Sequence, residues 1–97
     1  MTRVEIIANQ ALEEQLIEIM PVREGGHPCY TMIHQVDGSG YSGWCMGNDV
    51  WPEENILFIL YLNDIKLEKL KADINELRER FPILGLACFE LPGVVVF

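Results

Sequence analysis

Basic residues are scarce in this sequence. Seven Lys and Arg stand against fifteen Asp and Glu, which gives a formal net charge of −8 at pH 7. The stretch from Glu24 through Ile65 contains no Lys or Arg at all. Because phosphate contacts need clustered cations, this balance argues against a nucleic-acid-binding protein and against one that lies on anionic membrane surfaces.

Long hydrophobic runs are also lacking. The longest, Ile56 to Leu62, has seven residues, whereas a membrane-spanning helix needs roughly 20. Glu5 interrupts what would be the apolar part of a signal peptide. Three cysteines without CxxC spacing, Cys29, Cys45 and Cys88, are typical of thiols in a reducing compartment. We therefore expect a cytoplasmic protein that is not an integral membrane protein.

What the chain does contain is the composition of a folded protein. Its 97 residues are 49% hydrophobic and 23% charged, without repeats or low-complexity tracts. A chain of this length forms one domain, so we expect residues 1–97 to fold together.

Hydrophobic periodicity predicts the order of the elements. Strands are expected at residues 3–8, 29–36, 56–62 and 84–91. Asn9 is the expected N-cap of a first helix that ends before Pro21, and Asn63 or Asp64 that of a second that ends at Pro82. The second helix has the apolar stripe Leu67, Leu70, Ile74, Leu77 and Phe81.

The order βαββαβ predicts an α+β fold, the ferredoxin-like sandwich, in which two helices cover one face of a four-stranded antiparallel sheet. The strand at 56–62 is apolar on both of its faces, although this fold leaves the second sheet face without cover. Large exposed apolar patches are rare on monomers, so we expect another subunit on that face. The apolar stretch 94–97 is expected to be a further strand that pairs across subunits.

A long connection, Asp37 to Asn55, separates the second and third strands and reads DGSGYSGWCMGNDVWPEEN. Connections of this length in a small domain are usually functional. Its glycines let backbone N–H groups approach a ligand closely. Two interpretations remain open for its large aromatic residues: they fix the loop to a neighbouring subunit, or they stack on a planar ligand or dock a partner protein. These residues are Tyr41, Trp44 and Trp51.

The stretch VDGSGYSG, residues 36–43, is similar to the valine-x-glycine-x-glycine-x-x-glycine motif that opens the T-loop of the PII nitrogen-regulatory signal proteins. The segments RVEIIAN and WPEEN resemble those of some small PII-like proteins of unassigned role. This resemblance implies a homotrimer whose sheets face inwards. It also implies small ligands, such as nucleotides, in clefts between subunits, and a T-loop that regulates a partner protein.

The resemblance also assigns residues. It implies ligand binding at the base of the loop, by Val36, Gly38, Ser39, Gly40, Tyr41 and Gly43. We assign contact with a protein target to the deeper residues Trp44, Met46, Asp49 and Trp51. The family holds nucleotide phosphates with basic residues in the loop base and before the last strand, yet neither 37–55 nor Pro82–Gly85 contains Lys or Arg. A nucleotide bound in the family's manner is therefore not expected, and the ligand stays open.

A metal-binding protein is the alternative, since the CutA-like cation-tolerance proteins share this trimeric fold. His34 and Cys45 are the candidate ligands, with Met46, His27 and Cys29 as further soft donors that suit copper or zinc. Their spacings match no standard zinc motif. An enzyme is not expected, because no spacing brings a nucleophile, a base and an orienting acid together.

Overall fold

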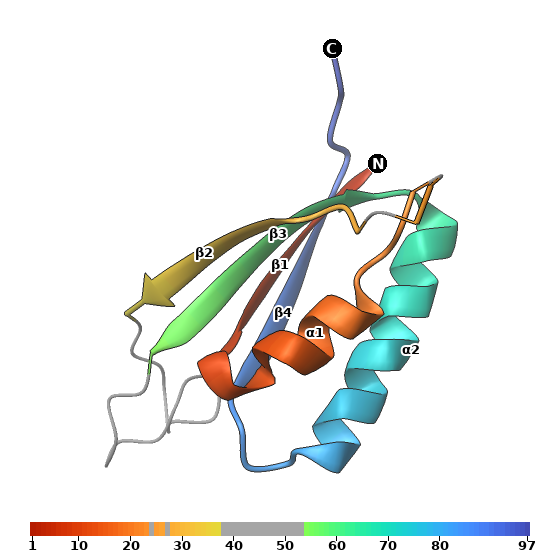
Figure 1. The fold of residues 1–97 in the computed structure, drawn as a ribbon. Helices are drawn as coiled ribbons and strands as arrows, with labels where there is room; N and C mark the ends of the chain where they lie inside the picture. Colours follow the sequence, from red (N-terminus) through yellow and green to blue (C-terminus); the bar gives the residue numbers. More distant parts are fainter. Residues whose placement is uncertain (24, 27, 38–53) are drawn as a thin grey trace.

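The computed structural model describes residues 1–23, 25–26, 28–37 and 54–97 (Figure 1). The elements are β1 (Thr2–Asn9), the 3₁₀ turn η1 (Gln10–Leu12), α1 (Glu13–Ile19), β2 (Thr31–Val36), β3 (Asn55–Leu62), α2 (Asp64–Arg80) and β4 (Leu86–Pro92). Among these residues no helix is long and apolar enough to cross a membrane.

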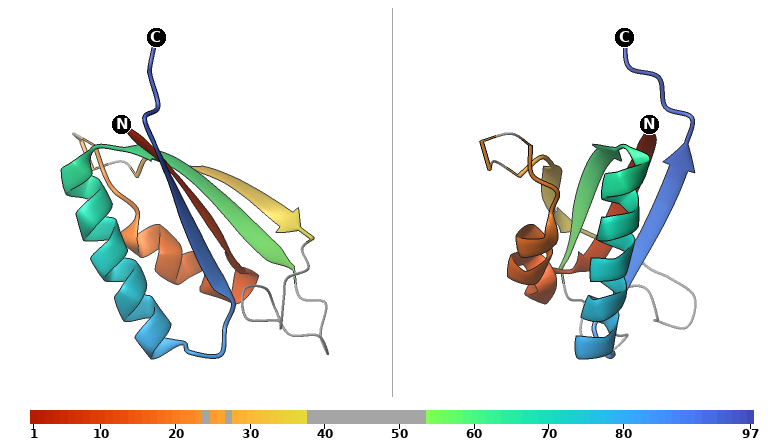
Figure 2. Two further views of the ribbon diagram at one scale, coloured as in Figure 1. Left: turned by 180° about the vertical axis from the view of Figure 1, so that it is seen from behind. Right: turned by 90° about the vertical axis from the view of Figure 1, so that its right-hand side faces the viewer.

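The strands form one four-stranded sheet in the order β2-β3-β1-β4, and every neighbouring pair is antiparallel. Both helices lie on the same face of this sheet (Figure 2). The predicted ferredoxin-like fold is therefore confirmed.

Two predicted strand starts are wrong. β2 begins at Thr31 rather than Cys29, because the Cys29 amide donates to the Pro21 carbonyl (3.0 Å) instead of joining the ladder with β3. β4 begins at Leu86 rather than Leu84, because the Leu84 amide donates to the Phe81 carbonyl (3.2 Å) in the turn after α2.

The core lies between the sheet and the helices. Alternate residues of β1 and β3 point into it, as the period of a strand requires; they are Val4, Ile6, Ala8, Ile56, Phe58, Leu60 and Leu62, all buried. Four residues of the predicted α2 stripe are buried against them, Leu67, Leu70, Ile74 and Leu77. Phe81 caps the helix and is only half-buried.

Both predicted N-caps are confirmed. The Asn9 Oδ1 accepts from the Ala11 amide at 2.8 Å, and the Asn63 Oδ1 accepts from the Lys66 amide at 2.9 Å. Such bonds satisfy amides that a helix end leaves without an intrahelical partner. Asn9 starts a 3₁₀ turn that leads directly into α1.

The second face of the sheet, here called the open face, is not covered by any element of the described chain (Figure 2). Its apolar residues are half-buried or exposed: Ile7, Ile33, Leu57, Ile59, Tyr61, Phe89 and Leu91. As far as the described residues go, the predicted apolar face without a covering element is present. Past Gly93 the Val94 amide donates to the Met1 carbonyl (3.0 Å), and the exposed tail then leads away from the sheet (Figure 1). Its pairing across subunits stays a prediction.

Candidate functional site

The strands that flank the long segment 38–53, β2 and β3, meet at one end of the sheet. β2 ends at Val36 and β3 begins at Asn55, and these residues are partners in the ladder. Between Ile33 and Val36 the register shifts, and Gln35 there has a φ of 57°. A non-glycine residue in the left-handed region is uncommon and accompanies a β-bulge, which re-aims the strand before it leaves the sheet.

Two other segments are hydrogen-bonded at this end of the sheet, here called the loop base. The Gln10 amide donates to the Glu54 carbonyl (3.1 Å), and the Asn9 amide donates to the Gly85 carbonyl (2.9 Å). The end of β1 therefore joins the start of β3 to the connection between α2 and β4. These are the two places, the loop base and the loop before the last strand, at which the resemblance expects the ligand.

A pair of buried asparagines lies at this junction. Asn9 and Asn55 are partners in the ladder of β1 and β3, and each is 2% exposed. The Oδ1 of Asn55 has no hydrogen-bond partner among the described residues. An unsatisfied buried acceptor costs roughly 1–3 kcal/mol, so Asn55 marks a position where a further donor would be favourable.

Sequence reasoning missed Asn55, which was taken only as the last residue of the loop. A signal was available: an asparagine directly before the apolar run ILFILYL is unusual, because asparagine is depleted in strands. Its burial and its missing partner need the three-dimensional register.

Of the predicted site residues, the structure describes Val36 and His34. Val36 is half-buried at the end of β2, and its role in ligand binding stays a prediction. Ten others lie outside the described residues, namely Gly38, Ser39, Gly40, Tyr41, Gly43, Trp44, Cys45, Met46, Asp49 and Trp51. Their roles stay predictions.

His34 connects β2 to α1. Its Nε2 lies 2.7 Å from the Oε1 of Glu13, and both side chains are partly exposed. In the described ranges no three His, Cys, Asp or Glu side chains gather as a metal site would require. Cys45 and His27 lie outside these ranges, so the metal site stays a prediction.

A polar network crosses the otherwise apolar open face. The Nε of Arg3 lies 2.9 Å from the Oε2 of Glu5, and its Nη1 donates to the hydroxyl of Tyr61 at 3.0 Å. The guanidinium also lies 5.9 Å from the centre of the Tyr61 ring. The hydrogen bond with Glu5 is the main cause that raises the pKa of Arg3. The network keeps the charge of Arg3 paired and hydrogen-bonded within the chain itself.

No family model matches the sequence, and no curated protein matches it as a relative. Solved structures do match. The fold is similar to that of CPII from Thiomonas intermedia, solved with ADP, AMP and acetate, with a TM-score of 0.62 and 17% identity over 93% of this chain and 84% of that chain. It is also similar to a PII-like signalling protein from Thermus thermophilus, with a TM-score of 0.56 and 24% identity over 93% of this chain and 83% of that chain. The predicted PII-like fold is thereby confirmed.

Proposed function

We propose that this chain, which has the fold of PII-like signalling proteins, is a binding and signalling module rather than an enzyme. It acts as a homotrimer that binds a small molecule in the clefts between subunits, beside the base of the 38–53 segment. It regulates a partner protein through that segment.

The observation that carries the proposal is the open face. The register aligns Ile33, Leu57 and Ile7 in one row across three strands. On the edge strand β4, Phe89 and Leu91 remain 48% and 44% exposed. Large contiguous apolar patches are rare on soluble monomers and often mark protein–protein contacts, and in a trimer with inward sheets this face would be the contact between subunits.

The polar network on that face is compatible with burial. A charge taken out of water is costly unless a partner and hydrogen bonds compensate it. Arg3 has both in Glu5 and Tyr61 of its own subunit. A second subunit can therefore cover this face without supplying a charge.

The loop base supports the signalling part. Val36, Asn55 and the neighbouring Gly85 belong to three different segments that hydrogen bonds and the ladder connect. A ligand at this junction would contact the root of the 38–53 segment directly. The glycines of the 38–53 segment permit more than one backbone arrangement. Ligand binding can therefore change which arrangement the partner protein meets.

Native mass spectrometry tests the assembly. We expect a mass near three times 11.1 kDa. Ile59→Lys, on the open face, should yield folded monomers, because a buried unpaired ammonium is costly. Ile65→Lys is the matched control, since Ile65 on α2 is 83% exposed, and it should leave the trimer intact. A monomeric parent protein would contradict the proposal.

Tryptophan fluorescence tests the loop. Trp44 and Trp51 are the only tryptophans of the chain and both belong to the 38–53 segment. We expect at least one member of a broad panel of small metabolites, with nucleotides included for comparison, to change their emission in a saturable way. Emission that stays constant across such a panel, with the trimer intact, would contradict ligand-dependent signalling through the segment.

A further inference from the structure

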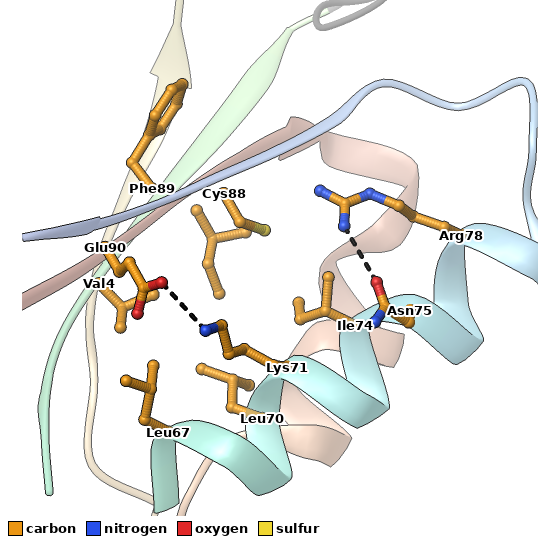
Figure 3. Close-up of a pocket in the computed structure, with 11 residues that line it drawn as sticks. Val4, Leu67, Leu70, Lys71, Ile74, Asn75, Arg78, Cys88, Phe89 and Glu90 are labelled. Atoms are coloured by element: carbon orange, nitrogen blue, oxygen red, sulfur yellow. Dashed lines mark hydrogen bonds and ion pairs between the residues drawn. The ribbon is translucent and has the colours of Figure 1, made fainter. Parts of the chain in front are cut away.

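A groove of about 190 Å³ lies between α2 and the paired strands β1 and β4 (Figure 3). Its floor is apolar and comes from both layers of the fold: Val4, Ile6, Leu67, Leu70 and Ile74. An apolar cavity of roughly 150 Å³ is large enough for a benzene molecule. The groove therefore has room for a small apolar group, such as an alkyl chain of about six carbons.

At one end of the groove the cation is already paired with carboxylates. The Lys71 Nζ lies 3.0 Å from the Oε1 of Glu90, so an ion pair spans from α2 to β4 (Figure 3). The hydrogen bond with Glu90 is the main cause that raises the pKa of Lys71. The same Nζ lies 3.9 Å from the Oε1 of Glu68, so Lys71 is paired with two carboxylates and is not available to pair with an anionic ligand.

The other end carries an uncompensated cation. The Nη1 of Arg78 donates to the Asn75 Oδ1 at 3.4 Å, and its Nη2 donates to the Leu86 carbonyl at 3.3 Å. Both acceptors are neutral and both bonds are long. In the part of the chain that the structure describes, no carboxylate lies within ion-pair distance of Arg78.

The neighbouring Cys88 does not supply the missing negative charge. Its side chain points from β4 into the groove (Figure 3). Burial raises the pKa of this thiol to about 11, so it is neutral near pH 7. Arg78 thus presents its positive charge at the edge of an apolar floor.

We propose that this groove binds a small amphipathic monocarboxylate. Its carboxylate pairs with the guanidinium of Arg78, whose planar donors match a carboxylate in a bidentate arrangement. Its alkyl chain lies over Leu70 and Ile74. The groove lies on the helix side of the sheet and is formed within one subunit, so this inference goes beyond the proposed function and does not depend on it.

A titration of the full chain followed by ¹⁵N NMR tests the site. The probes are sodium hexanoate, its neutral analogue 1-hexanol, and hexylammonium. We expect hexanoate to shift the amide signals of Leu70, Ile74 and Cys88, with an affinity at least about fivefold above that of hexanol, because of the charge-assisted hydrogen bonds. Hexylammonium should bind more weakly than hexanoate, because its charge repels Arg78. Equal affinities for hexanoate and hexanol, or shifts that avoid these residues, would overturn the proposal.

Two arginine variants sharpen this test. Arg78→Gln should lower the affinity for hexanoate about fivefold and leave that for hexanol unchanged. Arg80→Gln is the matched control, because Arg80 lies 5.2 Å from the Phe81 ring centre and does not line the groove. An equal loss in both variants would overturn the role of Arg78. If a variant fails to fold, the comparison of the three probes on the wild-type protein still tests whether the groove prefers a carboxylate. Native mass spectrometry tests the trimer separately.

Discussion

The two faces of the sheet carry similar apolar residues but differ in how deeply those residues are buried. β3 reads NILFILYL, and its apolar residues alternate between a face covered by helices and the open face. Phe58 is fully buried, whereas the next outward residues of the same strand are half-buried or exposed. Similar apolar side chains therefore have different roles on the two faces. Those on the covered face stabilise the fold of one chain, and those on the open face are available to stabilise an assembly of chains.

The strongest test of this difference compares neighbouring residues of β3. Phe58→Ala should lower the free energy of unfolding by about 3–5 kcal/mol, because it leaves a cavity in a packed core. Ile59→Ala, on the open face, should cost less than about 1 kcal/mol when measured at a dilution where the subunits are dissociated. Urea unfolding monitors both variants, and equal losses would contradict the distinction between the faces.

The pH dependence of stability probes the covered side of β4. The pKa of Cys88 in the folded chain is raised from 9.0 to about 11, so the unfolded chain loses this proton first. The contribution to stability is complete below pH 9 and is lost as the pH rises towards 11, by about 2 kcal/mol. Urea unfolding of the wild type and of Cys88→Ala should show a difference that shrinks over this interval; a constant difference would count against the buried thiol.

A smaller effect is expected from the network on the open face. Glu5→Gln leaves the charge of Arg3 without its carboxylate, so covering this face becomes costlier. We expect the subunits to dissociate at about tenfold higher protein concentration, measured by mass photometry or sedimentation. Glu14→Gln makes the same chemical change on the exposed side of α1 and should have no effect. Unchanged assembly of Glu5→Gln would exclude the network from the interface.

The smallest effect concerns the edge of the sheet. His34→Ala removes the contact with Glu13, and because both side chains are partly exposed we expect a loss below about 1 kcal/mol. Glu13→Gln should behave alike in urea unfolding. A loss above about 2 kcal/mol in His34→Ala alone, suppressed when a chelator is added to both proteins, would instead favour the metal-binding alternative.

The sequence was sufficient for those parts of the fold that depend on local patterns. Strand alternation, the stripe of α2 and the caps Asn9 and Asn63 are all encoded within a few neighbouring residues. The starts of β2 and β4 were predicted too early, because the amides of Cys29 and Leu84 bond within turns whose geometry the hydrophobic pattern does not carry.

The candidate sites depend on contacts between distant residues, and periodicity does not specify those. Arg3 and Tyr61 meet only because β1 pairs with β3 in one register. Asn55 lies opposite Asn9 of β1 in the ladder, and its buried Oδ1 has no partner among the residues that the structure describes. The groove at Arg78 requires the angle at which α2 lies over β4. Of the predicted ligand-binding residues, Val36 alone is described, and it lies at the expected loop base.

Strand β4 is the common wall of two of these surfaces. Cys88, Phe89 and Glu90 all line the groove, but the Phe89 ring points away from Cys88 and Glu90 (Figure 3) and, like Leu91, is exposed on the open face. Substitution of Cys88 or Glu90 can therefore change ligand binding in the groove, and substitution of Leu91 can change the association of subunits. A displacement of the β4 backbone would therefore change the shape of the groove and of the open face together.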